Sequence, residues 1–213
     1  MTERWDGVKF LKDRVEIIEQ QWVENLRKTD FFHSAIDLPE MEPRLRQVYM
    51  DTYCVTMMGF WNVSIIMQGV LFETFVKEVI FAKEKKDFQG TFGAAIQRCK
   101  KKGYLTDDEV RSLEKFKDAI RNPYQHMDVK KIVKDRKVDA WKIPIEKGRE
   151  AESIREGVER VFRGEAGAPE SLGYGDLRPV GIPIKESIDK QLALPLFLSV
   201  EKLVRDLSEK YFM

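Results

Sequence analysis

The sequence contains no charged residue between Thr52 and Phe72. An apolar run of this length is sufficient for a helix to cross a lipid bilayer. Polar side chains nevertheless interrupt it at Thr52, Thr56, Asn62, Ser64 and Gln68, and Glu73, Lys77 and Glu78 follow it directly. These interruptions favour a helix buried in the middle of a bundle, with a membrane span as the less favoured alternative.

Helical periodicity extends over most of the chain. Apolar residues recur with a helical period in the segments 5–28, 44–86, 92–102, 106–120 and 185–211. The middle of the segment 44–86 is apolar on nearly all sides, so we expect one long central helix, in which Gly59 and Gly69 mark close packing or a bend. Between these segments, 29–43 is predicted to be a break, 150–163 a polar helix and 164–183 a loop.

These patterns predict an all-α fold. We expect a single domain over residues 1–213, built as an antiparallel bundle of four to five main helices. Its core is expected from residues 44–127 together with 184–211, preceded by an N-terminal helix and loop over 1–43. The less periodic residues 128–183 are expected to form an irregular insertion before the last helix, which Pro195 either kinks or begins.

The net charge and the cysteine content argue against a globally basic nucleic-acid-binding protein and against a cysteine metal site. The net charge is +1, so no global basic field points to nucleic acid, and binding of this kind would depend on local patches. The two cysteines, Cys54 and Cys99, match no metal-binding spacing, and we expect neither a metal nor a cofactor. With no recognisable signal peptide, the chain is expected in the reducing cytoplasm.

The segment most suggestive of chemistry is Arg121 to His126. Thr106 and Glu109 form a capping-box pattern that begins the preceding helix. Because a residue before proline is disfavoured in the α region, we expect Asn122 to leave this helix and to cap a new one. The resulting corner would direct Arg121 and His126 at one spot, whereas a straight helix would place them roughly 140° apart around its axis.

An arginine and a histidine at one spot are suited to phosphodiester chemistry. The guanidinium binds phosphate oxygens through a planar fork of donors, and the imidazole exchanges a proton near neutral pH. A structural interpretation stays open beside this one. His126 would then bond a backbone carbonyl, and Arg121 would satisfy the last carbonyls of its helix.

Two stretches of the sequence resemble the HEPN superfamily, a group of all-helical domains marked by an arginine, a polar residue and a histidine. They are Gln68-Gly69-Val70-Leu71-Phe72-Glu73-Thr74-Phe75-Val76-Lys77 and Ala119-Ile120-Arg121-Asn122-Pro123-Tyr124-Gln125-His126. The resemblance covers about residues 49–127 and the last helix. It implies a HEPN-like bundle and, in many members, a metal-independent endoribonuclease of defence or toxin–antitoxin systems.

The resemblance also implies roles for individual residues. Arg121, Asn122 and His126 would form the catalytic motif, at a site shared by the two protomers of a homodimer. Glu73 would be a polar residue supporting the Arg–His pair, or else an ordinary glutamate at the edge of its helix. RNA is the implied substrate, and an antitoxin or other partner protein is an implied partner. Asp128 departs from toxin members that carry tyrosine there, which argues against a tyrosine-modifying antitoxin. The alternative is a noncatalytic helical module that binds a nucleotide, a nucleic acid or a partner protein.

Three basic runs lie around the motif. Lys83, Lys85 and Lys86 end one predicted helix, and Arg98 with Lys100, Lys101 and Lys102 ends the next. Both runs fit the placement of cations at helix C-termini and require no partner. Lys130, Lys131 and Lys134 follow the motif and are candidates for RNA backbone contact, with a solvated face as the alternative. Tyr124 is a candidate for stacking on a base or for packing.

Overall fold

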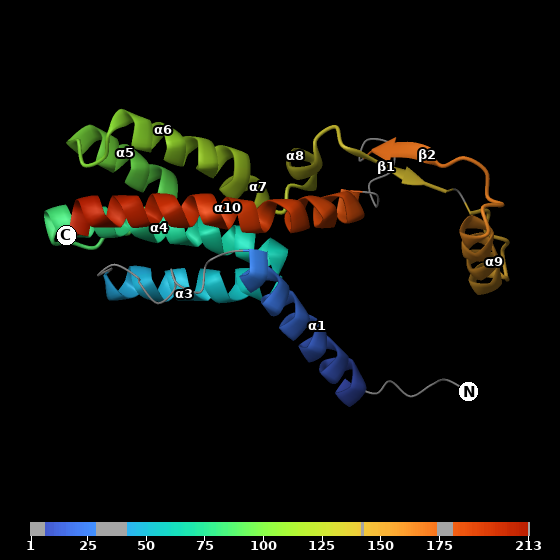
Figure 1. Ribbon diagram of the computed structural model, residues 1–213. Coiled ribbons are helices and arrows are strands. Elements are labelled where there is room, and N and C mark those ends of the chain that lie inside the picture. Colours follow the sequence, from blue (N-terminus) through green and yellow to red (C-terminus); the bar gives the residue numbers. More distant parts are fainter. Residues whose placement is uncertain (1–6, 29–41, 142, 174–180, 213) are drawn as a thin grey trace. The chain divides into compact units, whose positions relative to one another are not determined.

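The computed structural model describes residues 7–28, 42–141, 143–173 and 181–212, and its helices account for most of them (Figure 1). The chain divides into two compact units. The first comprises the residues up to Asp128 together with those from Ile188 onward, and the second comprises Val129–Ser187. None of the described helices is both long enough and apolar enough to cross a membrane.

The regular elements in the described residues of the first unit are all helices. Its elements are α1 (Gly7–Lys28), α3 (Pro43–Met57), α4 (Trp61–Glu84), α5 (Phe92–Lys102), α6 (Asp107–Phe116), the π-helical turn η1 (Lys117–Arg121), α7 (Asn122–Gln125) and most of α10 (Gly181–Phe212). One hydrophobic core joins side chains from α3, α4, α5, α6 and α10. Helix α4 is its centre, because residues on nearly every side of this helix are buried. The coarse prediction of an all-α fold is therefore confirmed.

The expected single helix over residues 44–86 is wrong, because the chain turns at Gly59. The amide of Phe60 donates to the carbonyl of Val55 at 3.0 Å, and the amide of Gly59 donates to that of Thr56 at 3.1 Å. This is the Schellman ending of α3, and it requires the left-handed conformation that Gly59 adopts at φ +77°. The uncharged run is thus shared between α3 and α4, which lie against each other as a helical hairpin.

The predicted end of α5 and the predicted start of α6 are confirmed. Gly103 follows α5 at φ +65° and closes a second Schellman turn. Thr106 accepts from the amide of Glu109, and the Glu109 carboxylate accepts from the amide of Thr106 at 2.7 Å, so both halves of the capping box form.

The expected corner at Asn122 is also wrong. Asn122 stays in the helical region at φ −65° and ψ −47°, and its amide donates to the carbonyl of Lys117, five residues before it. The chain therefore continues from α6 through η1 into α7. Pro123 lacks a donor and crowds the carbonyl four residues earlier, and a π turn is one of the irregularities by which a helix accommodates such a residue.

The second unit contains α8 (Val129–Val133), β1 (Lys137–Ala140), α9 (Glu150–Phe162) and β2 (Glu170–Gly173). Strands β1 and β2 pair antiparallel, with Lys137 opposite Gly173 and Ala140 opposite Glu170. The predicted polar helix is present as α9. The predicted loop over 164–183 is wrong in its described part, because it contains β2 and the start of α10, while residues 174–180 lie outside the described residues. Helix α10 continues past Pro195.

Candidate functional site

Arg121 ends the π turn and reaches across to α4. Its Nη2 donates to Oε2 of Glu73 at 2.8 Å, and the side chains of both residues are 20 % exposed. Glu73 also accepts from Lys77 through its other oxygen, Oε1, at 2.8 Å. The structure therefore brings together two residues that lie far apart in the sequence, and the carboxylate holds the guanidinium in one orientation.

Gly69 makes this contact sterically possible. A β-carbon built at Gly69 would lie 2.7 Å from Cγ of Arg121, well inside the distance at which carbon atoms meet. Gly69 precedes Glu73 by one helical turn, so both face the same side of α4. The stem of Arg121 therefore lies over a helix position without a side chain, while its head reaches the carboxylate one turn further along.

Asn122 contacts its neighbours through its side-chain amide. Its Oδ1 accepts from Nη1 of Arg121 at 3.3 Å, and its Nδ2 donates to Asp118 at 3.4 Å. The expected role of Asn122 as an N-cap is wrong, since the residue lies inside a continuous helical path and no side-chain cap bond forms at the start of α7. Its amide instead supports the orientation of the guanidinium.

His126 follows α7 as its C-cap residue and is exposed. The amides of Met127 and Asp128 close a Schellman turn on Tyr124 and Pro123, and Met127 takes the left-handed position at φ +49°. Because the backbone from Arg121 to Gln125 is helical, Arg121 and His126 are offset by roughly 140° around one axis. Within one protomer the two side chains therefore leave the helix on different sides.

Tyr124 cannot stack on a base. Only 2 % of this residue is exposed, and its hydroxyl donates to Oδ1 of the buried Asp189 on α10 at 2.7 Å. The packing interpretation of Tyr124 is therefore correct, and its proposed role in RNA binding is withdrawn. The contact joins the motif-bearing helix α7 to the last helix of the bundle.

The three lysines that follow the motif belong to the second unit. Lys130 and Lys131 lie on α8, Lys134 follows it at φ +52°, and all three are exposed. Their exposure is compatible with backbone contact to RNA and equally with a solvated face.

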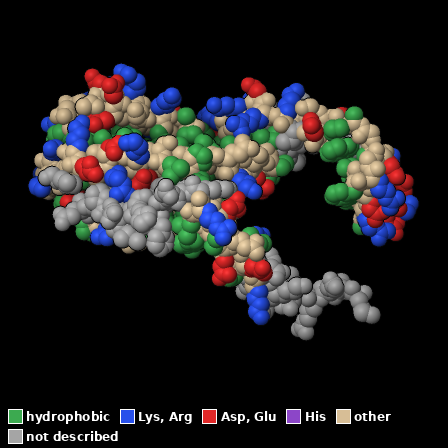
Figure 2. All heavy atoms as spheres, viewed as in Figure 1, with side chains coloured by type: hydrophobic (Ala, Val, Ile, Leu, Met, Phe, Trp, Pro, Cys, Tyr) green, Lys and Arg blue, Asp and Glu red, His purple; other side chains and the backbone are tan. Residues whose placement is uncertain are grey.

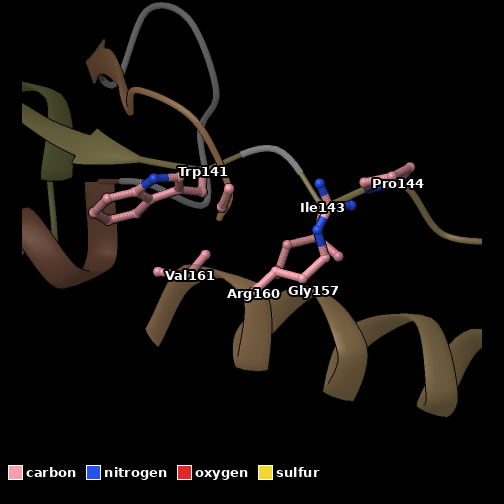
Figure 3. A pocket seen from close by; sticks show the side chains of 7 residues that line it. Trp141, Ile143, Pro144, Gly157, Arg160 and Val161 are labelled. Carbon is pink, nitrogen blue, oxygen red and sulfur yellow. The ribbon is translucent and has the colours of Figure 1, made fainter. Parts of the chain in front are cut away.

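The second unit also holds a cavity of about 210 Å³ (Figure 3). Trp141, Ile143 and Pro144 line it from the segment before α9, while Gly157, Arg160 and Val161 line it from α9. Among the described residues that line it, Arg160 is the one charged side chain, so these residues include no acid–base pair. Nor do the described residues contain a group of three or more His, Cys, Asp or Glu side chains placed to hold a metal ion.

Comparisons with protein-family models, with curated proteins and with solved structures find no match for this chain. The site must therefore be interpreted from its own geometry. Three of its contacts carry weight: Glu73 with Arg121, Gly69 beneath the stem of Arg121, and Asn122 beside the guanidinium.

Sequence reasoning missed some of these residues. It took Gly69 only as a point of close packing or a bend, and it did not single out Asp189 or Asp118. The local signal that could have found the crossing is a glycine one turn before a glutamate on a buried helix, Gly69 before Glu73.

Proposed function

We propose that the chain is a HEPN-like protein that cleaves RNA without a metal, using Arg121 and His126 in a site shared by two protomers. The observation that carries this proposal is the Arg121–Glu73 pair, a partly exposed guanidinium fixed in orientation within the same short helical segment as an exposed histidine. The π turn that presents Arg121 supports it, since such turns occur frequently at functional sites.

In the proposed reaction, His126 takes the proton from a ribose 2′-hydroxyl or protonates the leaving 5′-oxygen. Arg121 stabilises the negative charge that develops on the phosphate oxygens. The products are a 2′,3′-cyclic phosphate and a 5′-hydroxyl. The two-protomer site follows from the resemblance to the HEPN superfamily. The angular offset between Arg121 and His126 is compatible with it, because the arginine of one copy and the histidine of the other can approach a phosphate from opposite sides.

A noncatalytic binding module is the second candidate, and one observation favours it. The guanidinium of Arg121 already binds Glu73 and Asn122, and it lies 5.9 Å from the ring centre of Phe92. A guanidinium with this set of contacts is well placed to hold helices together, whether or not it ever meets a phosphate.

An RNA cleavage assay in EDTA, with analysis of the product ends, tests the proposal. We expect His126→Ala and Arg121→Ala each to abolish cleavage, and Gln125→Ala, an exposed neighbour on the same turn, to retain it. A mixture of the two inactive variants should recover part of the activity, since mixed dimers regain one complete Arg–His pair. Equal cleavage by wild type and both variants, or no cleavage by folded wild type, would favour the binding module.

A further inference from the structure

The ends of α4, α5 and α10 and the start of α6 lie at one end of the first unit (Figure 1). Two glutamates link them. Glu84, the last residue of α4, accepts from Nε of Arg98 on α5 at 2.8 Å and from the hydroxyl of Tyr104 at 3.2 Å. Glu109, in the first turn of α6, accepts from Lys210 at 2.6 Å and from Tyr211 at 2.9 Å, both in the last turn of α10. The two carboxylates thus tie together the ends of α4, α5 and α10 and the start of α6.

This arrangement gathers two basic runs that are separate in the sequence. Lys83, Lys85 and Lys86 lie at the end of α4, and Lys100, Lys101 and Lys102 lie at the end of α5. All six are exposed, and none forms an ion pair with a described residue. Figure 2 shows Lys and Arg side chains at this end of the bundle, at the left of the view. Glu84 and Glu109 bind internal partners, and Asp87, Asp107 and Asp108 lie at the same end, so the lysine charge is compensated in part.

A groove of about 480 Å³ lies at this end of the bundle. Lys83 lines it from α4, Tyr104 and Leu105 from the connection between α5 and α6, and Lys210 and Tyr211 from α10. The groove therefore combines lysines with aromatic rings. This is the composition of surfaces that bind single-stranded nucleic acid, where cations follow the phosphates and rings stack on the bases.

Cations at helix C-termini interact favourably with the helix dipole and need no ligand to explain them. That effect is confined to the last turn, and it does not require two helices to present lysine triplets at one end. In a chain of net charge +1, this end of the bundle carries more basic than acidic side chains and is a local basic patch.

We propose that this end of the bundle, with Lys83 in the groove and Lys85, Lys86 and Lys100–Lys102 at the adjoining helix ends, binds single-stranded RNA. The choice of RNA rests on the proposed function, whereas the surface itself is separate from Arg121 and His126. It holds the strand by its phosphates, with a base against Tyr104, while the Arg–His motif acts on another part of the same molecule.

Binding is measured by fluorescence anisotropy with a short labelled single-stranded RNA in EDTA, in a His126→Ala background that prevents cleavage. The triple variants Lys83→Gln/Lys85→Gln/Lys86→Gln and Lys100→Gln/Lys101→Gln/Lys102→Gln should each weaken binding at least about tenfold. Each should also reduce the slope of log affinity against log salt by about 2, since each phosphate contact contributes about 0.7 for a single strand.

A matched control removes three exposed basic residues elsewhere in the first unit, namely Lys12→Gln/Arg46→Gln/Lys190→Gln. It should change affinity less than about twofold, and replacing the lysines by arginine instead of glutamine should preserve binding. Tyr104→Leu should weaken binding about tenfold without changing the salt slope. Tyr104→Phe should leave the affinity unchanged, because it keeps the ring and loses only the hydroxyl bond to Glu84.

The outcomes separate this inference from the nuclease proposal. Binding that depends on the lysines in a protein that does not cleave RNA would support the surface and remove the nuclease. Cleavage by wild type, together with unchanged affinity and salt slope in both folded triple variants, would overturn the surface and leave the nuclease standing. An equal loss in the control variant would likewise overturn it, because the effect would then follow total charge.

Discussion

Gly69→Ala tests whether the stem of Arg121 truly occupies the space above α4. Alanine favours a helix interior over glycine by about 1 kcal/mol, so an uncrowded site would gain stability. Here the new methyl group would lie 2.7 Å from Cγ and 3.4 Å from Cβ of Arg121. Overpacking of this kind costs about 1–3 kcal/mol. Displacing the partly exposed guanidinium from Glu73 adds up to about 1 kcal/mol.

We therefore expect Gly69→Ala to lower the free energy of unfolding by about 1–2 kcal/mol, despite its better helix propensity. Urea denaturation followed by circular dichroism measures this change. Gly93→Ala, in α5, is the matched control, because its β-carbon would meet nothing closer than 3.8 Å. It should leave stability unchanged or raise it by up to about 1 kcal/mol.

A double-mutant cycle then identifies the cause. In an Arg121→Ala background the crowding atom Cγ is absent, so Gly69→Ala should become neutral or stabilising. The reasoning is refuted if Gly69→Ala is more stable than wild type, or if it destabilises both backgrounds equally. Such a result would mean that Arg121 does not lie across Gly69 and that the contact with Glu73 has no steric basis.

Three further predictions follow from other parts of the bundle. Burial raises the pKa of Glu78, with Glu42 and Asp87 adding to the rise and Arg44 opposing it. The cost of ionising Glu78 is therefore absent below its ordinary pKa of 4.5 and appears as pH rises through the folded-state pKa. In urea titrations, the change in the free energy of unfolding caused by Glu78→Gln should therefore be more stabilising at pH 7 than at pH 4. Tyr124→Phe should lower the free energy of unfolding by about 1–3 kcal/mol, since it leaves a buried carboxylate without this donor, and should leave RNA affinity unchanged in the anisotropy assay. Gly59→Ala should lower the melting temperature, because φ +77° costs an alanine about 1–2 kcal/mol.

The elements that sequence reasoning predicted correctly are those specified by local signals. Thr106 and Glu109 lie three residues apart and satisfy each other, and Gly103 follows a short helix at the position where a left-handed residue is needed. Neither the start of α6 nor the end of α5 depends on distant parts of the chain. The all-α class followed from apolar periodicity in the same local way.

The errors arose where the decisive contact is not local, or where two local rules compete. The apolar pattern continues through Gly59, so nothing in the pattern distinguishes a helical hairpin from one long helix. At Asn122 the rule for residues before proline competed with the continuity of α6, and a π turn resolved the competition in favour of the helix. Strands β1 and β2 pair although α9 separates them in the sequence, and short strands of this kind carry little periodic signal.

The contacts of Arg121 also limit how the proposed site can work. A guanidinium has five N–H donors, and the described contacts use one on Nη2 for Glu73 and one on Nη1 for Asn122. Donors remain for a phosphate, but the nearby carboxylate cancels part of the positive charge that would attract it. A single protomer therefore offers an oriented but weakened phosphate contact, with its histidine offset around the helix.

In the proposed dimer, a second copy would bring a histidine from the opposite side, which removes the angular deficit, and a second guanidinium, which adds donors for the phosphate. The proposed mechanism therefore depends on a second copy. Activity per protomer should rise with protein concentration as dimers form. A cleavage rate per protomer that stays constant down to concentrations at which the protein is monomeric would show that Arg121 and His126 do not act in the way proposed.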